Sequence, residues 1–262
     1  MEILFVADVF GRPGRDALLE GLARARRRGA PDFTVVNGEN AAGGFGLTPD
    51  IARSFLEAGA DVVTTGNHVW DKREIYPFLD EEPRLLRPDN YPPGNPGSGV
   101  WIGEIGGVPG AVVNLEGRVF MKRIECPFRR LDALLADERL AGARVVIVDF
   151  HAEATAEKVA MGRYADGRVT AVLGTHTHVP SADARILPGG TAYVTDAGMT
   201  GPHGGVIGVR PEAAIDRFLR QTPNRFEVST EDVRFQGVRV EVDPATGRAR
   251  SIERVDEPLG AP

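Results

Sequence analysis

Two histidines separated by one threonine, in the stretch VLGTHTHVPSAD, are the residues of this chain best suited to chemistry. His176 and His178 are two of only five histidines in the sequence. In an extended strand, alternate side chains point to the same face, so both imidazoles would leave the backbone on one side. Two imidazoles on one strand face seldom serve packing. The spacing therefore favours a metal site or a proton-transfer pair over a chance juxtaposition.

Polar side chains of the same kind end four other strand-like runs. The five runs end at Asp8, at Glu39 and Asn40, at Asn67 and His68, at His151, and at His176 and His178. Ligand crevices in α/β folds lie at the carboxyl ends of parallel strands, so we expect these residues to meet. Imidazoles suit zinc, iron and manganese, while carboxylate and amide oxygens suit harder cations. The set is large enough for two metal ions that share a carboxylate or a solvent molecule.

Other site chemistries find less support. The segment DVFGRPG lacks the G-x-G-x-x-G spacing of a dinucleotide-binding turn, and the sequence has no P-loop and no G-x-S-x-G motif. The single cysteine, Cys126, lies away from every histidine in the sequence, which disfavours a cysteine nucleophile. A polar crevice that binds a nucleotide without metal is the alternative that the residues leave open.

The elements that must position these residues alternate between strands and helices. Apolar runs at 2–8, 32–40 and 61–68 alternate with amphipathic stretches at 15–28 and 47–60, which predicts βαβ units with parallel strands. Thr48 is expected to cap the second helix and Pro49 to begin it. The remainder predicts strands at 144–151 and 169–178, helices at 127–143, 154–167 and 211–221, and hairpins at 99–117, 184–198 and 234–255. We therefore predict an α/β fold, with two packed sheets and outer helices in a single domain.

Composition limits the class of protein. The 262 residues are 42% hydrophobic and 26% charged, as in soluble globular proteins, and no apolar run approaches the length of a membrane span. A net charge of −6 argues against broad binding to duplex nucleic acid, although a small nucleotide could occupy a local positive site. The single cysteine and the lack of a basic, apolar leader predict a cytoplasmic protein without a secretion signal.

The order AD…NGEN…GNH…H…GTHTH resembles the calcineurin-like metallophosphoesterases, and more closely their YmdB-like branch of 2′,3′-cyclic-nucleotide 2′-phosphodiesterases. The similar stretches run through most of the chain, and GNHVWDK and DFHAEATAEK are the most specific. The resemblance implies a two-sheet β-sandwich flanked by helices, in four αββα layers, with residues 1–262 as one metallophosphoesterase domain. The start DVF, with Phe10 where a histidine is common, and NGEN in place of GDxxD both match the YmdB-like branch.

The resemblance also implies roles for the strand-end residues. It implies two metal ions, iron or manganese, with zinc also compatible, that share Glu39. One ion would be held by Asp8, Glu39, Asn40 and His178, and the other by Glu39, Asn67, His151 and His176. His68 is the expected proton donor. In this assignment His176 and His178 serve different ions, and Thr177 between them keeps both imidazoles facing the site.

The expected reaction is metal-assisted hydrolysis of a 2′,3′-cyclic nucleotide to a 3′-nucleotide, with a hydroxide that bridges the metals as the nucleophile. A broader phosphodiesterase or phosphatase, and a metal-stabilised regulatory protein with residual activity, are the alternatives. The expected partner is a small nucleotide, and a homo-oligomer is compatible with the family. Four residues have a structural and a functional interpretation of equal weight: Arg118 at a substrate phosphate, Asp71 and Lys72 beside His68, and Asp149 against a ligand imidazole.

Overall fold

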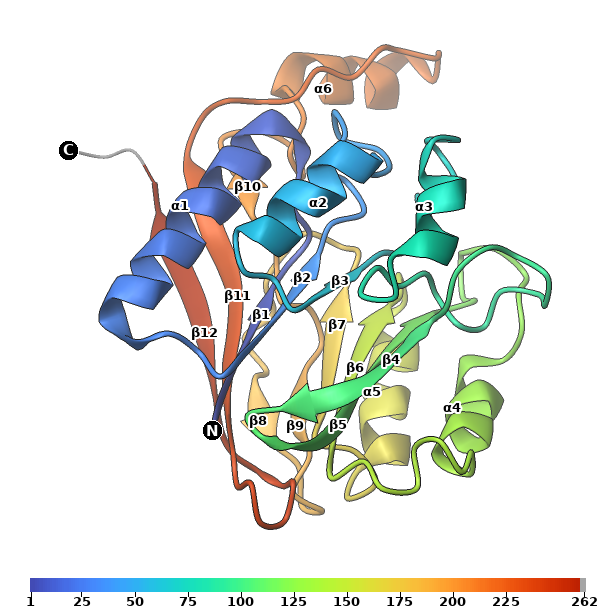
Figure 1. The fold of residues 1–262 in the computed structure, drawn as a ribbon. Coiled ribbons are helices and arrows are strands. Elements are labelled where there is room, and N and C mark those ends of the chain that lie inside the picture. The colour runs from blue at the N-terminus through green and yellow to red at the C-terminus, as the bar shows by residue number, and fades with distance from the viewer. Residues whose placement is uncertain (260–262) are drawn as a thin grey trace.

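Two six-stranded sheets pack face to face in the computed structural model, which describes residues 1–259 (Figure 1). The first sheet contains β1 (Glu2–Val6), β2 (Phe33–Asn37), β3 (Val62–Thr64), β10 (Gly201–Pro202), β11 (Val233–Val242) and β12 (Ala249–Pro258). The second contains β4 (Val100–Ile105), β5 (Val108–Glu116), β6 (Val145–His151), β7 (Ala171–Thr175), β8 (Arg185–Ile186) and β9 (Ala192–Val194). The predicted α/β fold with two packed sheets is confirmed.

Helices cover the outer face of each sheet. The first sheet packs against α1 (Gly11–Gly29), α2 (Pro49–Glu57) and α3 (Ile75–Glu81), and the second against α4 (Pro127–Leu135) and α5 (Thr155–Ala165). The last helix, α6 (Pro211–Arg220), lies at the top of the view in Figure 1, apart from these layers. The layers therefore follow the αββα order. Among residues 1–259, no helix combines the length and the apolar composition needed to cross a membrane.

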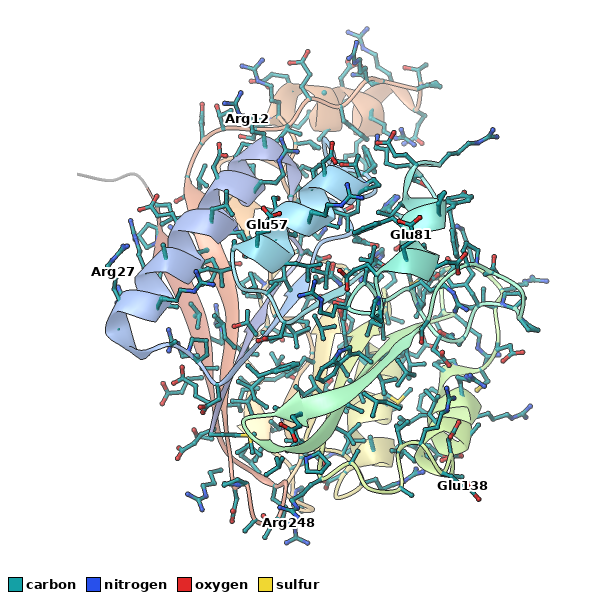
Figure 2. The ribbon with its side chains drawn as sticks, in the orientation of Figure 1. Arg12, Arg27, Glu57, Glu81, Glu138 and Arg248 are labelled. Carbon is teal, nitrogen blue, oxygen red and sulfur yellow. The ribbon has the colours of Figure 1, made fainter. Side chains whose placement is uncertain are left out.

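The space between the sheets is filled by alternate residues of the strands. Along β1, Ile3 and Phe5 belong to the core between the sheets, whereas Leu4 and Val6 pack towards the helices. All four side chains are fully buried. The sequence of a strand covered on both faces is one continuous apolar run, because successive side chains point to opposite faces and both faces are buried. Charged side chains such as Arg27 and Glu57 instead lie on the outer surface of the helices (Figure 2).

Strand direction brings the polar strand ends together. In the first sheet, β1, β2 and β3 are parallel, and in the second, β5, β6, β7 and β9 are parallel. The carboxyl ends of each parallel set therefore lie at one edge of its sheet. The chain returns at the end to complete the first sheet, since β11 pairs antiparallel with β1 and places Glu241 opposite Glu2.

Most of the predicted elements are present, with differences at their ends. The three hairpins form, and the Thr48 hydroxyl accepts a hydrogen bond from the Ile51 amide at the start of α2 (3.4 Å). The helix predicted over 127–143 ends at Leu135, because the Asp137 carboxylate accepts the Arg139 amide (2.9 Å) and holds a turn instead. The helix predicted from residue 15 begins at Gly11. The short helix α3 was not predicted, because Pro77 within it interrupts the helical sequence pattern.

Candidate functional site

The eight predicted site residues lie where the carboxyl edges of the two sheets meet. The first sheet supplies Asp8 after β1, Glu39 and Asn40 after β2, and Asn67 and His68 after β3; the second supplies His151 at the end of β6, and His176 and His178 after β7. Among them, Asp8, Glu39 and His151 are fully buried. The strand-end pattern therefore predicted a set of residues that the fold does bring together from both sheets.

The carboxylate of Glu39 joins the contributions of the two sheets. Its Oε1 lies 2.9 Å from His151 Nε2, and the same oxygen accepts a hydrogen bond from Asn40 Nδ2 at 3.1 Å. Its Oε2 accepts the backbone amide of His68 at 3.2 Å. One buried side chain thus contacts residues that follow β2 and β3 of the first sheet and a residue of β6 in the second.

Two imidazoles and an amide surround Glu39 on the side of the second sheet. His151 Nε2 lies 3.0 Å from Asn67 Oδ1 and 3.0 Å from His176 Nδ1. One possible ligand atom from each of Glu39, His151 and His176 lies within 4.8 Å of the others. A donor set of one carboxylate and two imidazoles at this spacing suits a transition-metal ion.

A second group of donors lies on the other side of Glu39. Asn40 Nδ2 is 3.1 Å from His178 Nε2, and His178 Nδ1 is 3.1 Å from the carbonyl of Ile207. Asp8 Oδ2 accepts the His176 amide at 2.9 Å, whereas Asp8 Oδ1 is buried without a hydrogen-bond partner among the described residues. A buried carboxylate oxygen without a donor is costly, and a bound cation would satisfy it. The residues present therefore fit a metal ion on this side as well.

Gly66, the first residue of the GNH motif, leaves the room that this cluster occupies. A Cβ atom at this position would lie 2.3 Å from His151 Cδ2 and 2.4 Å from Glu39 Oε2, closer than real Cβ contacts come. Both contacts are with side chains of the cluster that are themselves fully buried. Any residue other than glycine would therefore displace one of them.

Charge couples the buried groups of the cluster. Burial opposes ionisation of His151, but the neighbouring Glu39 carboxylate outweighs it and raises the pKa of His151 to about 9. Burial likewise opposes ionisation of Glu39, and the His151 imidazolium outweighs it and lowers the pKa of Glu39 to about 2. Burial, with the positive charge of His151, lowers the pKa of His176 to about 3. Without cations, the cluster therefore holds an imidazolium–carboxylate pair, whose proton a metal ion would displace.

Asp149 supports the cluster indirectly. Its Oδ1 accepts the Thr175 hydroxyl at 2.7 Å, and that hydroxyl lies 2.9 Å from His151 Nδ1. Its Oδ2 accepts bonds from Asn37 Nδ2 (2.9 Å) and Thr64 Oγ1 (2.5 Å), which come from the first sheet. Asp149 thus reaches the imidazole through Thr175, and it ties the two sheets together just beneath the cluster.

The two histidines of GTHTH do not lie on a strand. β7 ends at Thr175, and His176 and His178 have φ angles of 103° and 65°, in the left-handed region. The strand predicted over 169–178 therefore ends early, and the expectation that both imidazoles leave one strand face is wrong. The Asp196 carboxylate accepts the backbone amide (3.1 Å) and the hydroxyl (2.8 Å) of Thr177, which draws the chain out of the strand into a turn.

Asp196 is a functional residue that the sequence interpretation missed, together with its partner Lys158. Lys158 Nζ lies 2.7 Å from Asp196 Oδ2, and both side chains are almost completely buried. Asp196 follows β9, so it has the strand-end position that identified the other residues. Lys158 could also have been singled out from the sequence, because only three of the 31 basic residues are lysines.

All three lysines of the chain lie beside the cluster. Lys122 Nζ is 3.4 Å from the carbonyl of Asn67, and Lys72 packs against Gly46 next to the His68 carbonyl. Lys158 completes the set through its ion pair with Asp196. The three lysines therefore lie at the site, although arginine supplies most of the basic residues of the chain.

The cluster opens into a cavity of about 510 Å³. Its polar side includes Glu39, Asn40, His68, His176 and His178, and its apolar wall includes Phe10, Phe45, Ile207, Phe218 and Phe226. Phe10 packs edge-on against the His178 ring, with 5.5 Å between ring centres, and so forms part of the cavity wall rather than a ligand. A larger hollow, of about 680 Å³ over the start of α1, contains none of the predicted site residues.

His68 lies at the edge of this cavity and is held by two contacts. Its Nδ1 is 2.8 Å from Asp71 Oδ2, and its ring lies edge-on to Phe45 with 5.1 Å between centres. Asp71 thus orients the His68 ring. The Arg118 side chain is exposed and forms no ion pair within residues 1–259, and His203 lies outside the cavity with Nε2 2.8 Å from the Met199 carbonyl.

The whole chain is similar to proteins of known sequence and structure. Residues 4–255 match the family described as YmdB-like protein. A Bacillus subtilis (strain 168) protein named 2′,3′-cyclic-nucleotide 2′-phosphodiesterase is 48% identical over 255 residues, which cover 97% of this chain and 96% of that protein. The crystal structure of a hypothetical protein from Thermus thermophilus is 45% identical, with a TM-score of 0.91 over 98% of this chain and 100% of that one. A Mycoplasma pneumoniae structure described as a novel phosphatase is 36% identical, with a TM-score of 0.92 over 98% and 93%.

The buried ion pair under the His176–His178 turn makes Lys158 critical for stability. We expect Lys158→Met to lower the free energy of unfolding by about 3–5 kcal/mol, because the Asp196 charge would stay buried without its partner. The double variant Lys158→Met/Asp196→Asn should recover part of this loss. Urea unfolding measures both. Arg163→Met, at an exposed arginine of the same helix, is the matched control, and an equal effect of both substitutions would contradict this role for Lys158.

Glu116, at the end of β5 beside His151, makes stability depend on pH. Both of its carboxyl oxygens are buried without a hydrogen-bond partner among residues 1–259, and burial raises its pKa to about 7 from the ordinary 4.5. The folded protein therefore binds a proton that the unfolded chain has lost between these values, so the contribution of Glu116 to stability falls as pH rises from 4.5 to 7 and is constant above. Over this range the ionisation of Glu116 lowers the free energy of unfolding by about 3 kcal/mol.

Glu116→Gln removes this titration. In metal-free protein, we expect the free energy of unfolding of the variant, relative to the native chain, to rise by about 3 kcal/mol between pH 4.5 and pH 8. Urea unfolding at a series of pH values measures the difference, which cancels any constant effect of the new amide. Glu104→Gln, at an exposed carboxyl of β4, is the control. A flat difference for Glu116→Gln would show that the carboxyl is not held neutral.

Proposed function

Because the chain belongs to the YmdB-like family, we propose that it is a metal-dependent phosphodiesterase that hydrolyses 2′,3′-cyclic nucleotides to 3′-nucleotides. The observation that carries this proposal is the convergence of eight carboxylate, amide and imidazole residues from both sheets in one cluster, five of which line the cavity. The similarity to a protein named for this activity supports the choice of substrate. In this proposal residues 1–262 work as one metallophosphoesterase domain, in the reducing environment of the cytoplasm.

The proposed metal ligands follow the two groups of donors around Glu39. One ion would take Asp8, Glu39, Asn40 and His178, and the other Glu39, Asn67, His151 and His176. The contacts of Glu39 with Asn40 and with His151 support a shared carboxylate. Mixed nitrogen and oxygen donors suit iron or manganese, and zinc is compatible. When bound, the ions supply positive charge that neutralises the phosphate oxygens and lowers the pKa of solvent.

His68 is the proposed proton donor to the leaving 2′-oxygen. Hydrolysis adds the oxygen of one water molecule to phosphorus, breaks the bond between phosphorus and the 2′-oxygen, and leaves a 3′-phosphate. The 2′-oxygen must gain a proton as this bond breaks, and an imidazole can donate one through a ring N–H. The contact between His68 Nδ1 and Asp71 holds the ring at the edge of the cavity while the other nitrogen remains available.

The two-sided cavity suits a nucleotide better than a simple phosphate ester. Its polar side would take the charged phosphate, and its apolar wall, which includes Phe45, Ile207 and Phe218, would take the nucleoside. Small-molecule sites commonly combine apolar walls with a few polar groups in this way. A broader phosphatase is the second candidate, supported by the similarity to the Mycoplasma pneumoniae protein.

Metal analysis combined with product identification tests the proposed function. We expect the purified protein to hold two equivalents of metal and to convert 2′,3′-cyclic AMP into 3′-AMP without 2′-AMP. The same preparation should be assayed on 3′,5′-cyclic AMP and on p-nitrophenyl phosphate. Equal turnover of all three would favour the broader phosphatase, and metal-loaded protein that does not cleave 2′,3′-cyclic AMP would overturn the proposal.

Substitutions separate the proton donor from the metal ligands. His68→Ala should lower kcat by about 10²–10⁴-fold with its metal content unchanged, because only proton transfer is lost. Glu39→Ala should lose both metal and activity, since its carboxylate is shared. His203→Ala, at the histidine outside the cavity, is the matched control. Normal turnover by His68→Ala would exclude the donor role, and full metal occupancy of Glu39→Ala would exclude the shared ligand.

A further inference from the structure

The segment Arg118–Arg123, which we call the basic loop, leads from β5 towards α4 and is fixed to the site at its start. The Gly117 amide donates to the carbonyl of His151 at 2.9 Å. The next two amides, of Arg118 and Val119, donate to the buried carboxylate of Glu157 at 3.0 and 3.1 Å. The backbone at the start of this loop is therefore held against the residue that ends β6 in the cluster.

The basic loop also touches the site from the other side. Lys122 Nζ lies 3.4 Å from the carbonyl of Asn67, whose side-chain oxygen is 3.0 Å from His151 Nε2. Asn67 precedes His68, so the loop borders the cluster beside the proposed proton donor. The apolar wall of the cavity comes from other segments, those that contain Phe10, Phe45, Ile207 and Phe226, and from α6.

The cationic side chains of the basic loop have no acidic partner among the described residues. Arg118, Lys122 and Arg123 are exposed, and within residues 1–259 none of them forms an ion pair. Three cations within six residues form a local positive group in a chain with a net charge of −6. Such a group would attract a chain of phosphates.

Phe120, at the tip of the loop, is exposed and strained. Its side chain is 89% exposed, and its φ angle of 64° lies in the left-handed region that bulky residues avoid. A strained backbone and an exposed aromatic ring both lower stability, and residues with such features are common at binding sites. Aromatic rings beside cations are the features by which proteins bind single-stranded nucleic acid, through base stacking and phosphate contacts.

We propose that the basic loop binds single-stranded RNA that ends in a 2′,3′-cyclic phosphate, with the terminal nucleotide in the cavity and the preceding nucleotides on the loop. The substrate class then extends from mononucleotides to RNA 3′ ends, and this inference rests on the proposed function. The reaction at the end is unchanged: water adds to phosphorus, the bond to the 2′-oxygen breaks, and the RNA keeps a 3′-phosphate. The loop lacks the amphipathic helix by which proteins commonly lie on membranes.

Comparison of two substrates tests the proposal. We expect kcat/KM of the native protein to be about tenfold higher for a hexaribonucleotide with a 2′,3′-cyclic phosphate end than for 2′,3′-cyclic AMP, from stacking and phosphate contacts. This preference should fall as salt rises from about 50 to 200 mM. The double variant Phe120→Ala/Arg123→Gln should lose the preference and keep native kcat/KM on 2′,3′-cyclic AMP, because neither side chain lines the cavity.

The matched control carries the same kinds of substitution elsewhere. Arg27→Gln/Leu219→Ala replaces an exposed arginine at the far end of α1 and an exposed apolar residue of α6, and it should keep the preference (Figure 2). A native protein without the preference, or a loop variant that keeps it, would overturn the proposal.

A binding measurement makes the proposal independent of catalysis. Fluorescence anisotropy with metal-free protein and a labelled hexaribonucleotide carrying a 3′-phosphate should give a Kd about tenfold weaker for the loop variant than for the native chain. Equal Kd values would overturn RNA binding by the loop. If phosphatidylglycerol vesicles bind the native chain and the hexaribonucleotide does not, the loop is a membrane contact and the proposal is wrong. Native protein that cleaves neither substrate, but shows the Kd difference, would refute the proposed function and leave RNA binding supported.

Discussion

One buried carboxylate, Glu39, is the constraint on which the rest of the site depends. A carboxylate without solvent must find positive charge or hydrogen-bond donors, and Glu39 finds them on both sheets, in His151, Asn40 and the His68 amide. The two sheets must therefore pack with their carboxyl edges aligned for this group to be satisfied. The glycine at position 66 follows from the same requirement, since no larger residue fits against the pair.

Two further buried acids keep the donor groups in place. Asp149 connects hydroxyl and amide groups of both sheets beneath His151, and Asp196 holds the turn that carries His176 and His178. Each accepts several hydrogen bonds, which offsets the cost of burying its charge. Their role resembles that of the outer residues which orient ligands in metal sites.

The sequence predicted which residues converge at the strand ends better than it predicted the contacts that fix their positions. Strand-end position identified Asp8, Glu39 and His151, because parallel strands bring their carboxyl ends to one edge and this geometry depends on little else. It did not reveal that His176 and His178 lie in a turn, since that turn depends on Asp196, which is 19 residues from Thr177 in the sequence.

The same limit applies to the fold. Periodicity predicted the sheets and nearly all of the helices, but it misplaced helix ends that local side chains decide, as Asp137 does after α4. It also missed α3, where a proline interrupts the pattern. β1 can pair with β11 only late in translation, because Glu2 and its partner Glu241 are far apart in the chain. At the usual pace of translation, roughly 10–50 s separate the emergence of these strands from the ribosome. For that interval one edge of β1 has no partner, so the strand that leads to Asp8 is open to pairing with other chains.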